Sequence, residues 1–298
     1  MLETRPFGTT GLTVTALGFG AMQAGVPEFP EAEAARLLHG ALDLGIRLID
    51  TARSYGVSEE RIGRHLAHRR DEYVLSTKLG YGVDGVPDWT YECVRRGVDA
   101  ARDRLRTDVV DVVHLHSCPL DVLLHAGVAE ALADAVAAGK VRVAAYSGEN
   151  EALDHAIERA SSPATRTFGA VQLSVNVCES HALARACAAR EHRLGVLAKR
   201  PLAGLPWRSE APPDDPPHAE YWRRFQSLRV IAPVDWAEVG LRYAAHAPGV
   251  DACLVGGTRL DHLRRNVEAV GRGPLPPAAL EAVAAVHRAA GAGWRGVI

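Results

Sequence analysis

Five side chains that can carry chemistry lie at the ends of three consecutive apolar runs of the sequence. They supply a carboxylate, a phenol, an ammonium and two imidazoles: Asp50, Tyr55, Lys78, His114 and His116. Such groups can move protons, a lysine amine can form a Schiff base, and paired histidines can bind a metal ion. Each residue alone is more often a solvated or capping group than a catalyst. Their shared position at the ends of apolar runs is what indicates a functional site.

Eight short runs rich in Val, Ile and Leu predict the strands that position these groups. The runs are 14–22, 46–52, 73–80, 109–117, 141–148, 170–177, 194–202 and 251–258. Amphipathic segments lie between most of them, and strands that alternate with helices pair in parallel through right-handed crossovers. We therefore predict an α/β fold, a TIM-type (β/α)8 barrel that forms a single domain over residues 1–298. An open, doubly wound sheet is the alternative.

In such a barrel the chemistry lies at the C-terminal ends of the strands. Asp50 closes the second predicted strand, Tyr55 lies on the loop that follows, and Lys78 ends the third strand. His114 and His116 end the fourth strand and, being two residues apart, point to the same side of it. The barrel is therefore expected to bring all of these groups to one face.

Two segments depart from the repeat. The stretch FGTTGLTVTA (7–16) predicts a β-hairpin that closes the N-terminal face of the barrel. Residues 205–230 are rich in proline and carboxylates and predict a functional loop over the catalytic face. Its aromatic residues either line the pocket or pin the loop to the body of the protein: Trp207, Tyr221 and Trp222.

The composition argues against several classes of partner. Lys and Arg number 34 against 36 Asp and Glu, so no strong field would attract nucleic acid or an acidic membrane. No run approaches the ~20 apolar residues of a spanning helix, and the N-terminus does not resemble a signal peptide. The 5 cysteines are scattered, which argues against a disulfide framework or a structural zinc site. We expect a cytoplasmic protein with reduced thiols, and the sequence does not indicate its oligomeric state.

Several motifs resemble those of the aldo-keto reductase family. GIRLIDTARSYGVSEERIG (45–63) resembles the family signature GxxxxDTAxxYGxSEExxG, VLSTKLG its lysine strand and DVVHLH its histidine strand. GKVRVAAYSG, VQLSVN and LVGGTRLDHLRRN are similar to the family's GKIRxIGVSN, VQxxYN and GxxxPEHLxEN. The resemblance implies a barrel enzyme that moves hydride between NADPH and a carbonyl, reducing an aldehyde or ketone or oxidising the alcohol.

By this resemblance the catalytic residues are Asp50, Tyr55, Lys78 and His116. Tyr55 would donate a proton to the carbonyl oxygen, and a nearby ammonium makes a phenol a better acid. Lys78 would supply that charge and Asp50 would hold the lysine, while His116 would bind the substrate oxygen. The role of His114 is not assigned.

The resemblance also implies a set of residues that bind NADPH or NADP+. They are Met22, Asp50, Ser147, Gly148, Gln172, Lys199, Arg200, Leu202, Gly204, Gly257, Thr258, Arg259, His262 and Asn266. Ser147 and Gln172 would contact the nicotinamide carboxamide, although Gly148 stands where the family often has asparagine. Lys199 stands where the family commonly has an aromatic ring, with Arg200 beside it. The segment from Gly257 to Asn266, with Arg264, would bind the adenosine and its 2′-phosphate.

Three other functions remain open. A barrel metallohydrolase would need ligands at further strand ends, but "AYSG", "VNV" and "VGGT" contain no His, Asp or Glu, so we predict no metal. An aldolase would need an uncharged Lys78, which an aspartate partner disfavours. A third reading is an NADPH-binding sensor with little turnover. For an enzyme, specificity is expected to rest on residues 205–230 and on four residues near the site: Met22, Tyr81, Trp89 and Cys118.

Overall fold

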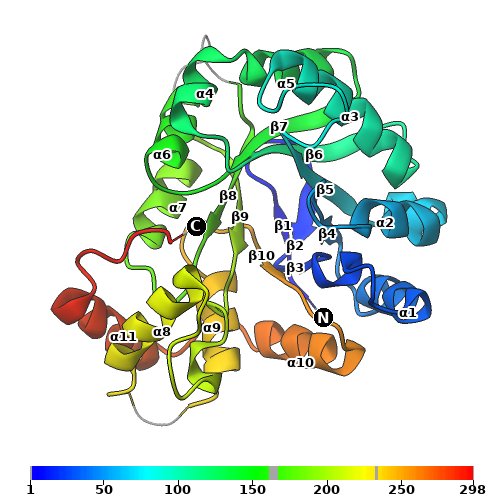
Figure 1. The fold of residues 1–298 in the computed structure, drawn as a ribbon. Coiled ribbons are helices and arrows are strands. Elements are labelled where there is room, and N and C mark those ends of the chain that lie inside the picture. Colours follow the sequence, from blue (N-terminus) through cyan, green and yellow to red (C-terminus); the bar gives the residue numbers. More distant parts are fainter. Residues whose placement is uncertain (1, 161–166, 232–233, 298) are drawn as a thin grey trace.

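The computed structural model describes residues 2–160, 167–231 and 234–297, and its centre is a closed barrel of eight parallel strands (Figure 1). The strands follow one another around the barrel in chain order: β3 (Leu17–Gly20), β4 (Leu48–Asp50), β5 (Val74–Leu79), β6 (Val110–His116), β7 (Val141–Ser147), β8 (Ala170–Ser174), β9 (Gly195–Lys199) and β10 (Ala252–Val255). The barrel closes where Cys253 of β10 pairs with Leu17 of β3. The predicted TIM-type barrel is confirmed, and the alternative of an open sheet is wrong.

Helices surround the barrel, as Figure 1 shows. They are α1 (Glu31–Asp43), α2 (Ser58–Leu66), α3 (Tyr91–Leu105), α4 (Leu120–His125), α5 (Val128–Ala137), α6 (Asn150–Arg159), α7 (Ala182–Glu191), α8 (Pro216–Leu228), α9 (Trp236–Ala245), α10 (Leu260–Gly271) and α11 (Pro277–Ala290). Short 3₁₀ turns occur at η1 (Gln23–Gly25), η2 (Ala67–Glu72) and η3 (Pro206–Arg208). Of the helices described, none has the length and apolar character needed to cross a membrane.

The predicted N-terminal hairpin is confirmed, and it closes the end of the barrel at which the strands begin. Strands β1 (Thr4–Pro6) and β2 (Thr13–Thr15) pair antiparallel. Phe7 is 1% exposed and packs in the barrel interior with alternate residues of β4 to β10. The ring lies so close to Gly195 that a Cβ there would come within 2.6 Å of it.

The first predicted strand, 14–22, is two elements rather than one. Val14 belongs to β2 of the hairpin, and the barrel strand β3 begins at Leu17. The Thr15 hydroxyl donates to the carbonyl of Leu17 and accepts from the amide of Arg47. These two hydrogen bonds fix the bend between β2 and β3. An apolar run in the sequence does not reveal such a bend.

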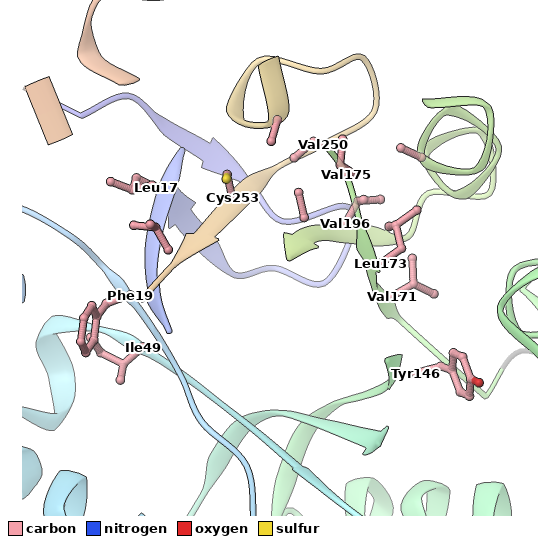
Figure 2. Close-up of a cluster of buried hydrophobic side chains, with 14 of the residues drawn as sticks. Leu17, Phe19, Ile49, Tyr146, Val171, Leu173, Val175, Val196, Val250 and Cys253 are labelled. Atoms are coloured by element: carbon pink, nitrogen blue, oxygen red, sulfur yellow. The ribbon is translucent and has the colours of Figure 1, made fainter. Parts of the chain in front are cut away.

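Side-chain alternation along the strands separates an outer core from the barrel interior. Ile49, Val171 and Val196 belong to the large buried cluster shown in Figure 2, which includes residues of the surrounding helices. Their neighbours Leu48 and Leu197 belong to the interior cluster. Because successive residues of a strand point to opposite faces, the residues two further along from the interior set also face inward. At the C-terminal ends of the strands those positions carry the polar groups of the site.

Residues 205–230, which we predicted to be a functional loop over the catalytic face, include regular structure. Pro206–Arg208 form a 3₁₀ turn and Pro216–Leu228 form helix α8. Asp215 caps this helix by accepting a hydrogen bond from the amide of His218, and Pro216 occupies the first turn. Proline suits that position because the first-turn amides have no partner within the helix. Pro216 and Pro217, two of the prolines that suggested a loop, therefore mark the start of a helix.

Candidate active site

The site is built from inward-facing positions at the ends of neighbouring strands. Asp50 lies two residues after the interior residue Leu48 on β4, and Lys78 lies four after the interior residue Val74 on β5. His114 and His116 continue the inward-facing series of β6 after Val112. The period of two along each strand thus delivers these side chains to the same end of the barrel.

Asp50 and Lys78 form a buried ion pair at the centre of the site. Lys78 is 1% exposed, and its Nζ donates to Asp50 Oδ2 over 2.5 Å and to the carbonyl of Thr51 over 2.8 Å. Burial opposes the charge of the lysine, but the charge of Asp50 and the nearby Tyr55 outweigh it, so the pKa of Lys78 is raised. The ammonium therefore persists at neutral pH.

Tyr55 and His116 lie beside this ion pair. The Nζ of Lys78 lies 4.9 Å from the centre of the Tyr55 ring. The rings of Tyr55 and His116 meet edge to face, with centroids 5.9 Å apart. Burial and the positive charges of Lys78 and Lys199 lower the pKa of His116 to about 2, so this imidazole is neutral. The four residues predicted as catalytic are therefore neighbours.

His114 supports the carboxylate of Asp50 through Ser76. The Ser76 hydroxyl donates to Asp50 Oδ1 over 2.7 Å, and His114 Nε2 lies 3.1 Å from the same hydroxyl oxygen. Burial and the charge of Lys78 lower the pKa of His114 to about 3, so it too is neutral. The histidine that the sequence left unassigned thus lies beneath the site, where it is fully buried.

A cavity of about 480 Å³ opens above these groups. Asp50, Tyr55 and His116 line it. Seven of the predicted cofactor residues line it as well: Met22, Asp50, Gln172, Lys199, Arg200, Leu202 and Gly204. The candidate catalytic groups and much of the candidate cofactor site therefore share one space.

The remaining predicted cofactor residues lie outside the lining of this cavity. Ser147 is buried and donates to the side-chain oxygen of Gln172 over 2.9 Å, which places it just beneath the wall. Thr258 and Arg259 border a separate hollow of about 440 Å³ next to the start of α10. His262 on α10 is exposed. Gly257 and Asn266 are half-buried. These last positions lie on or just before α10 and outside the lining of the cavity.

The packing of Tyr146 explains why residue 148 is a glycine. A Cβ at this position would lie 2.5 Å from the hydroxyl of Tyr146, which donates to the carbonyl of Cys118. An asparagine therefore has no room unless Tyr146 moves. The carboxamide contact that the family resemblance associates with an asparagine at this position is not available from residue 148.

Glu149, the next residue, was not singled out in the sequence. Its carboxylate accepts from the amide and the hydroxyl of Ser174, at 2.9 and 2.7 Å, and pairs with Lys199 at 3.1 Å. This ion pair holds the ammonium of Lys199, so the lysine is not free to replace the expected aromatic ring. Glu149 follows the end of β7 by two residues. The expectation that the ends of the later strands carry no carboxylate is therefore wrong.

Glu179 is a second buried carboxyl that the sequence did not reveal. It is 2% exposed, and the hydroxyl of Tyr221 donates to it. Burial, together with the negative charge of Glu149, raises the pKa of Glu179 to about 8, against the opposing charges of Lys199 and Arg224. Glu179 is therefore protonated at neutral pH and forms part of the support for α8.

This raised pKa predicts a pH-dependent loss of stability. The unfolded carboxyl ionises near pH 4.5 and the folded one near pH 8, so its stabilising effect is complete below the first value and disappears through the second. Glu179→Gln should remove this dependence. The melting temperature of the variant should rise relative to the original protein between pH 6 and pH 9, by a few degrees. Exposed Glu281→Gln is the control, and equal pH slopes in all three proteins would contradict the assignment.

The aromatic residues of 205–230 divide between the two roles considered. Tyr221 lines the cavity, whereas Trp207 packs on Phe225 and Trp222 donates to the carbonyl of Ser209. Among the four residues expected to set specificity, Met22 lines the cavity. Tyr81 packs against Trp89 beside His116, and Cys118 is buried at 1% exposure.

Among the described residues, no group of three or more His, Cys, Asp or Glu side chains is arranged so that it could hold a metal ion. His114 and His116 do not converge on a common ligand, because their partners are Ser76 and Tyr81. Metal independence stays a prediction.

Comparison with known proteins identifies relatives that match either most of the chain or a part of it. A D-threo-aldose 1-dehydrogenase from Pseudomonas sp is 30% identical over 312 residues, covering 90% of this chain and 93% of the relative. An L-galactose dehydrogenase from Arabidopsis thaliana is 38% identical over 122 residues, and the match spans 38% of its length. The holo form of aldo-keto reductase AKR11C1 from Bacillus halodurans has the same fold, with a TM-score of 0.82 and 24% identity over 96% of both chains.

The model of the aldo/keto reductase family matches residues 16–288, which include all four predicted catalytic positions. Membership of this family supports an oxidoreductase that carries out NAD(P)-dependent carbonyl reduction. The extent of this match, together with the closed barrel, shows that the chain belongs to the aldo/keto reductase family.

Proposed function

We propose that this protein reduces an aldehyde or ketone, or oxidises the corresponding alcohol, by hydride exchange with NADPH, with Tyr55 as the general acid or base. The observation that carries the proposal is the buried Asp50–Lys78 ion pair, which lies against Tyr55 and beside a neutral His116. These groups line or border one cavity.

The residues around the cavity suit a nicotinamide nucleotide. Gln172 and Ser147 offer amide and hydroxyl groups for a carboxamide, next to Asp50. Arg200 lines the cavity, and its guanidinium has no ion pair or hydrogen bond with any described residue. An unpaired guanidinium beside Leu202 and Gly204 fits a pyrophosphate. When bound there, the reduced nucleotide would supply the hydride.

The side chains of the protein would manage the charge and the proton. A carbonyl that gains hydride develops negative charge on its oxygen, and a donor placed beside that oxygen stabilises the transition state. Tyr55 would release its proton to the oxygen, while the ammonium of Lys78 stabilises the phenolate that remains. Asp50 keeps Lys78 charged and fixed. His116, being neutral, can donate one hydrogen bond to the same oxygen and orient it.

A screen of aldehydes, ketones and aldoses, followed by loss of NADPH absorbance, tests this proposal. Aldoses belong in the screen because two relatives carry the names of sugar dehydrogenases. We expect turnover with at least one class of carbonyl compound. Tight NADPH binding without turnover across the screen would favour the sensor function instead.

We predict that the enzyme prefers NADPH to NADH. Thr258 and Arg259 lie at the start of α10, where backbone amides favour an anion, and Arg264 is exposed on the same helix. Arg259 pairs with Asp261 at 3.0 Å, so a phosphate would have to compete with this carboxylate. Losing one charge-assisted contact should lower the ratio of kcat/KM for NADPH over NADH by about 10-fold.

Arg259→Ala and Arg264→Ala test this preference, and Arg265→Ala is the matched control. Arg265 is on the same helix, 66% exposed, and pairs with Asp261, so its removal should leave the ratio unchanged. Equal efficiency of the original enzyme with both cofactors would contradict the prediction.

A further inference from the structure

Tyr81 makes a contact with His116 that the catalytic roles above do not use. The Tyr81 hydroxyl lies 2.7 Å from Nδ1 of His116, and the two rings lie nearly parallel, with centroids 5.8 Å apart. His116 lines the cavity, whereas Tyr81 does not. Tyr81 therefore occupies Nδ1 of the imidazole, which leaves Nε2 as the ring nitrogen available to a carbonyl in the cavity.

The position of Tyr81 is fixed by its own surroundings. The ring of Trp89 packs edge to face against it, with centroids 5.5 Å apart. Trp89 in turn packs so closely on Gly80 that a Cβ there would come within 2.1 Å of the indole, and its amide donates to the carbonyl of Gly80 over 2.7 Å. The hydroxyl is thus held in place before any ligand binds.

The direction of this hydrogen bond decides what His116 can do. A neutral imidazole has one N–H, so the partner of one ring nitrogen determines the state of the other. If Tyr81 donates to Nδ1, the proton of the ring is on Nε2. If Nδ1 donates instead, Nε2 is a bare acceptor and cannot stabilise a developing oxyanion.

Two contacts compete for the proton of Tyr81. Its oxygen lies 3.2 Å from Ser54 Oγ and 2.7 Å from His116 Nδ1, so the histidine contact is the closer one. Ser54 is exposed and can hydrogen-bond to water, whereas Nδ1 is covered by Tyr81. Burial raises the pKa of Tyr81, so the phenol has a proton to donate at neutral pH.

We propose that Tyr81 is a positioning residue that fixes the tautomer of His116. Its hydroxyl donates to Nδ1, so Nε2 carries the only ring proton and points it at the substrate oxygen. The catalytic consequence rests on the proposed carbonyl reduction, but the tautomer itself does not. An Asp–His pair plays a comparable part in serine proteases, where the aspartate binds one ring nitrogen of the histidine and thereby holds the ring in the required tautomer.

Long-range ¹H–¹⁵N NMR of protein labelled in histidine tests the tautomer without any turnover. The His116 signals are assigned by their loss in His116→Gln. We expect a neutral ring protonated at Nε2, with Nδ1 as an acceptor. In Tyr81→Phe the Nδ1 signal should move towards that of an acceptor without a partner. Ser54→Ala should leave it in place, because the proton of Tyr81 goes to His116. A ring protonated at Nδ1, or a larger shift in Ser54→Ala than in Tyr81→Phe, would overturn the proposal.

Single-turnover reduction provides the second readout. Tyr81→Phe should slow hydride transfer by about 10-fold to 100-fold, the loss seen when a partner that orients a metal-binding imidazole is removed, with little change in NADPH affinity. Tyr73→Phe, just before the other end of β5, should leave the rate unchanged. An unchanged rate in Tyr81→Phe with an active original enzyme would overturn this inference alone. An original enzyme inactive on all carbonyls would instead overturn the proposed function, and the NMR result would still decide the tautomer.

Discussion

Replacing Tyr55 with phenylalanine is expected to slow carbonyl reduction by about 100-fold to 10,000-fold, the range that general acid catalysis supplies. The ring and its contacts with Lys78 and His116 remain, so NADPH affinity should change little. The loss should fall on the chemical step, because the proton is needed most in the transition state. Single-turnover kinetics under saturating substrate measure that step.

Tyr91→Phe is the matched control for this variant. The hydroxyl of Tyr91 donates to Asp134 at the surface, outside the cavity lining, so its loss should leave hydride transfer unchanged. A Tyr55→Phe enzyme within a few-fold of the original would show that Tyr55 only shapes the entrance to the cavity.

Replacing Lys78 with methionine is expected to abolish most activity and also to destabilise the fold. Asp50 is 3% exposed and would remain as a buried carboxylate without its cation. Breaking such a pair typically costs about 3–5 kcal/mol, which corresponds to a melting temperature lower by roughly 10 °C. The rate of reduction should fall by at least about 100-fold because the phenolate of Tyr55 loses its stabilising charge.

A double variant separates these two effects. Lys78→Met with Asp50→Asn removes the orphaned charge, so the melting temperature should recover much of the loss while the rate does not. Recovery of activity in the double variant would mean that the ion pair serves stability alone.

Much of the barrel could be predicted from the sequence because its signals are local. Apolar runs mark the strands, and the rule that parallel strands present their C-terminal ends to one face places Asp50, Lys78 and His116 together. The period of two along β6 puts His114 and His116 on one side, and the structure confirms this, because His114 contacts Ser76 beneath the site and His116 lines the cavity.

Other features could not be predicted because they depend on contacts between distant segments. Glu149 follows β7 but acts through Ser174 and Lys199, on two later strands. Glu179 is buried and accepts a hydrogen bond from Tyr221 of α8, which lies 42 residues away in the sequence. The apposition of Tyr81 and His116 depends on a loop folded back by Trp89, and no spacing in the sequence encodes it.

Helix α8 is a different case, since its start did have a sequence signal. Asp215 followed by Pro216 is a capping residue followed by proline in the first helical turn, and the structure uses both in that way. The density of proline and carboxylate residues obscured this local pattern. The expectation of a functional segment near the site still has support, because His218 and Tyr221 line the cavity.

The proposed mechanism is tested most directly by following the hydride itself. NADPH carrying deuterium at the transferred position of the nicotinamide is mixed with a carbonyl substrate, and the alcohol is analysed by mass spectrometry. We expect one deuterium on the carbinol carbon, in alcohol formed rapidly by the original enzyme and at least about 100-fold more slowly by Tyr55→Phe. Oxidised cofactor with an unlabelled alcohol, or labelled alcohol formed at an undiminished rate by Tyr55→Phe, would contradict it.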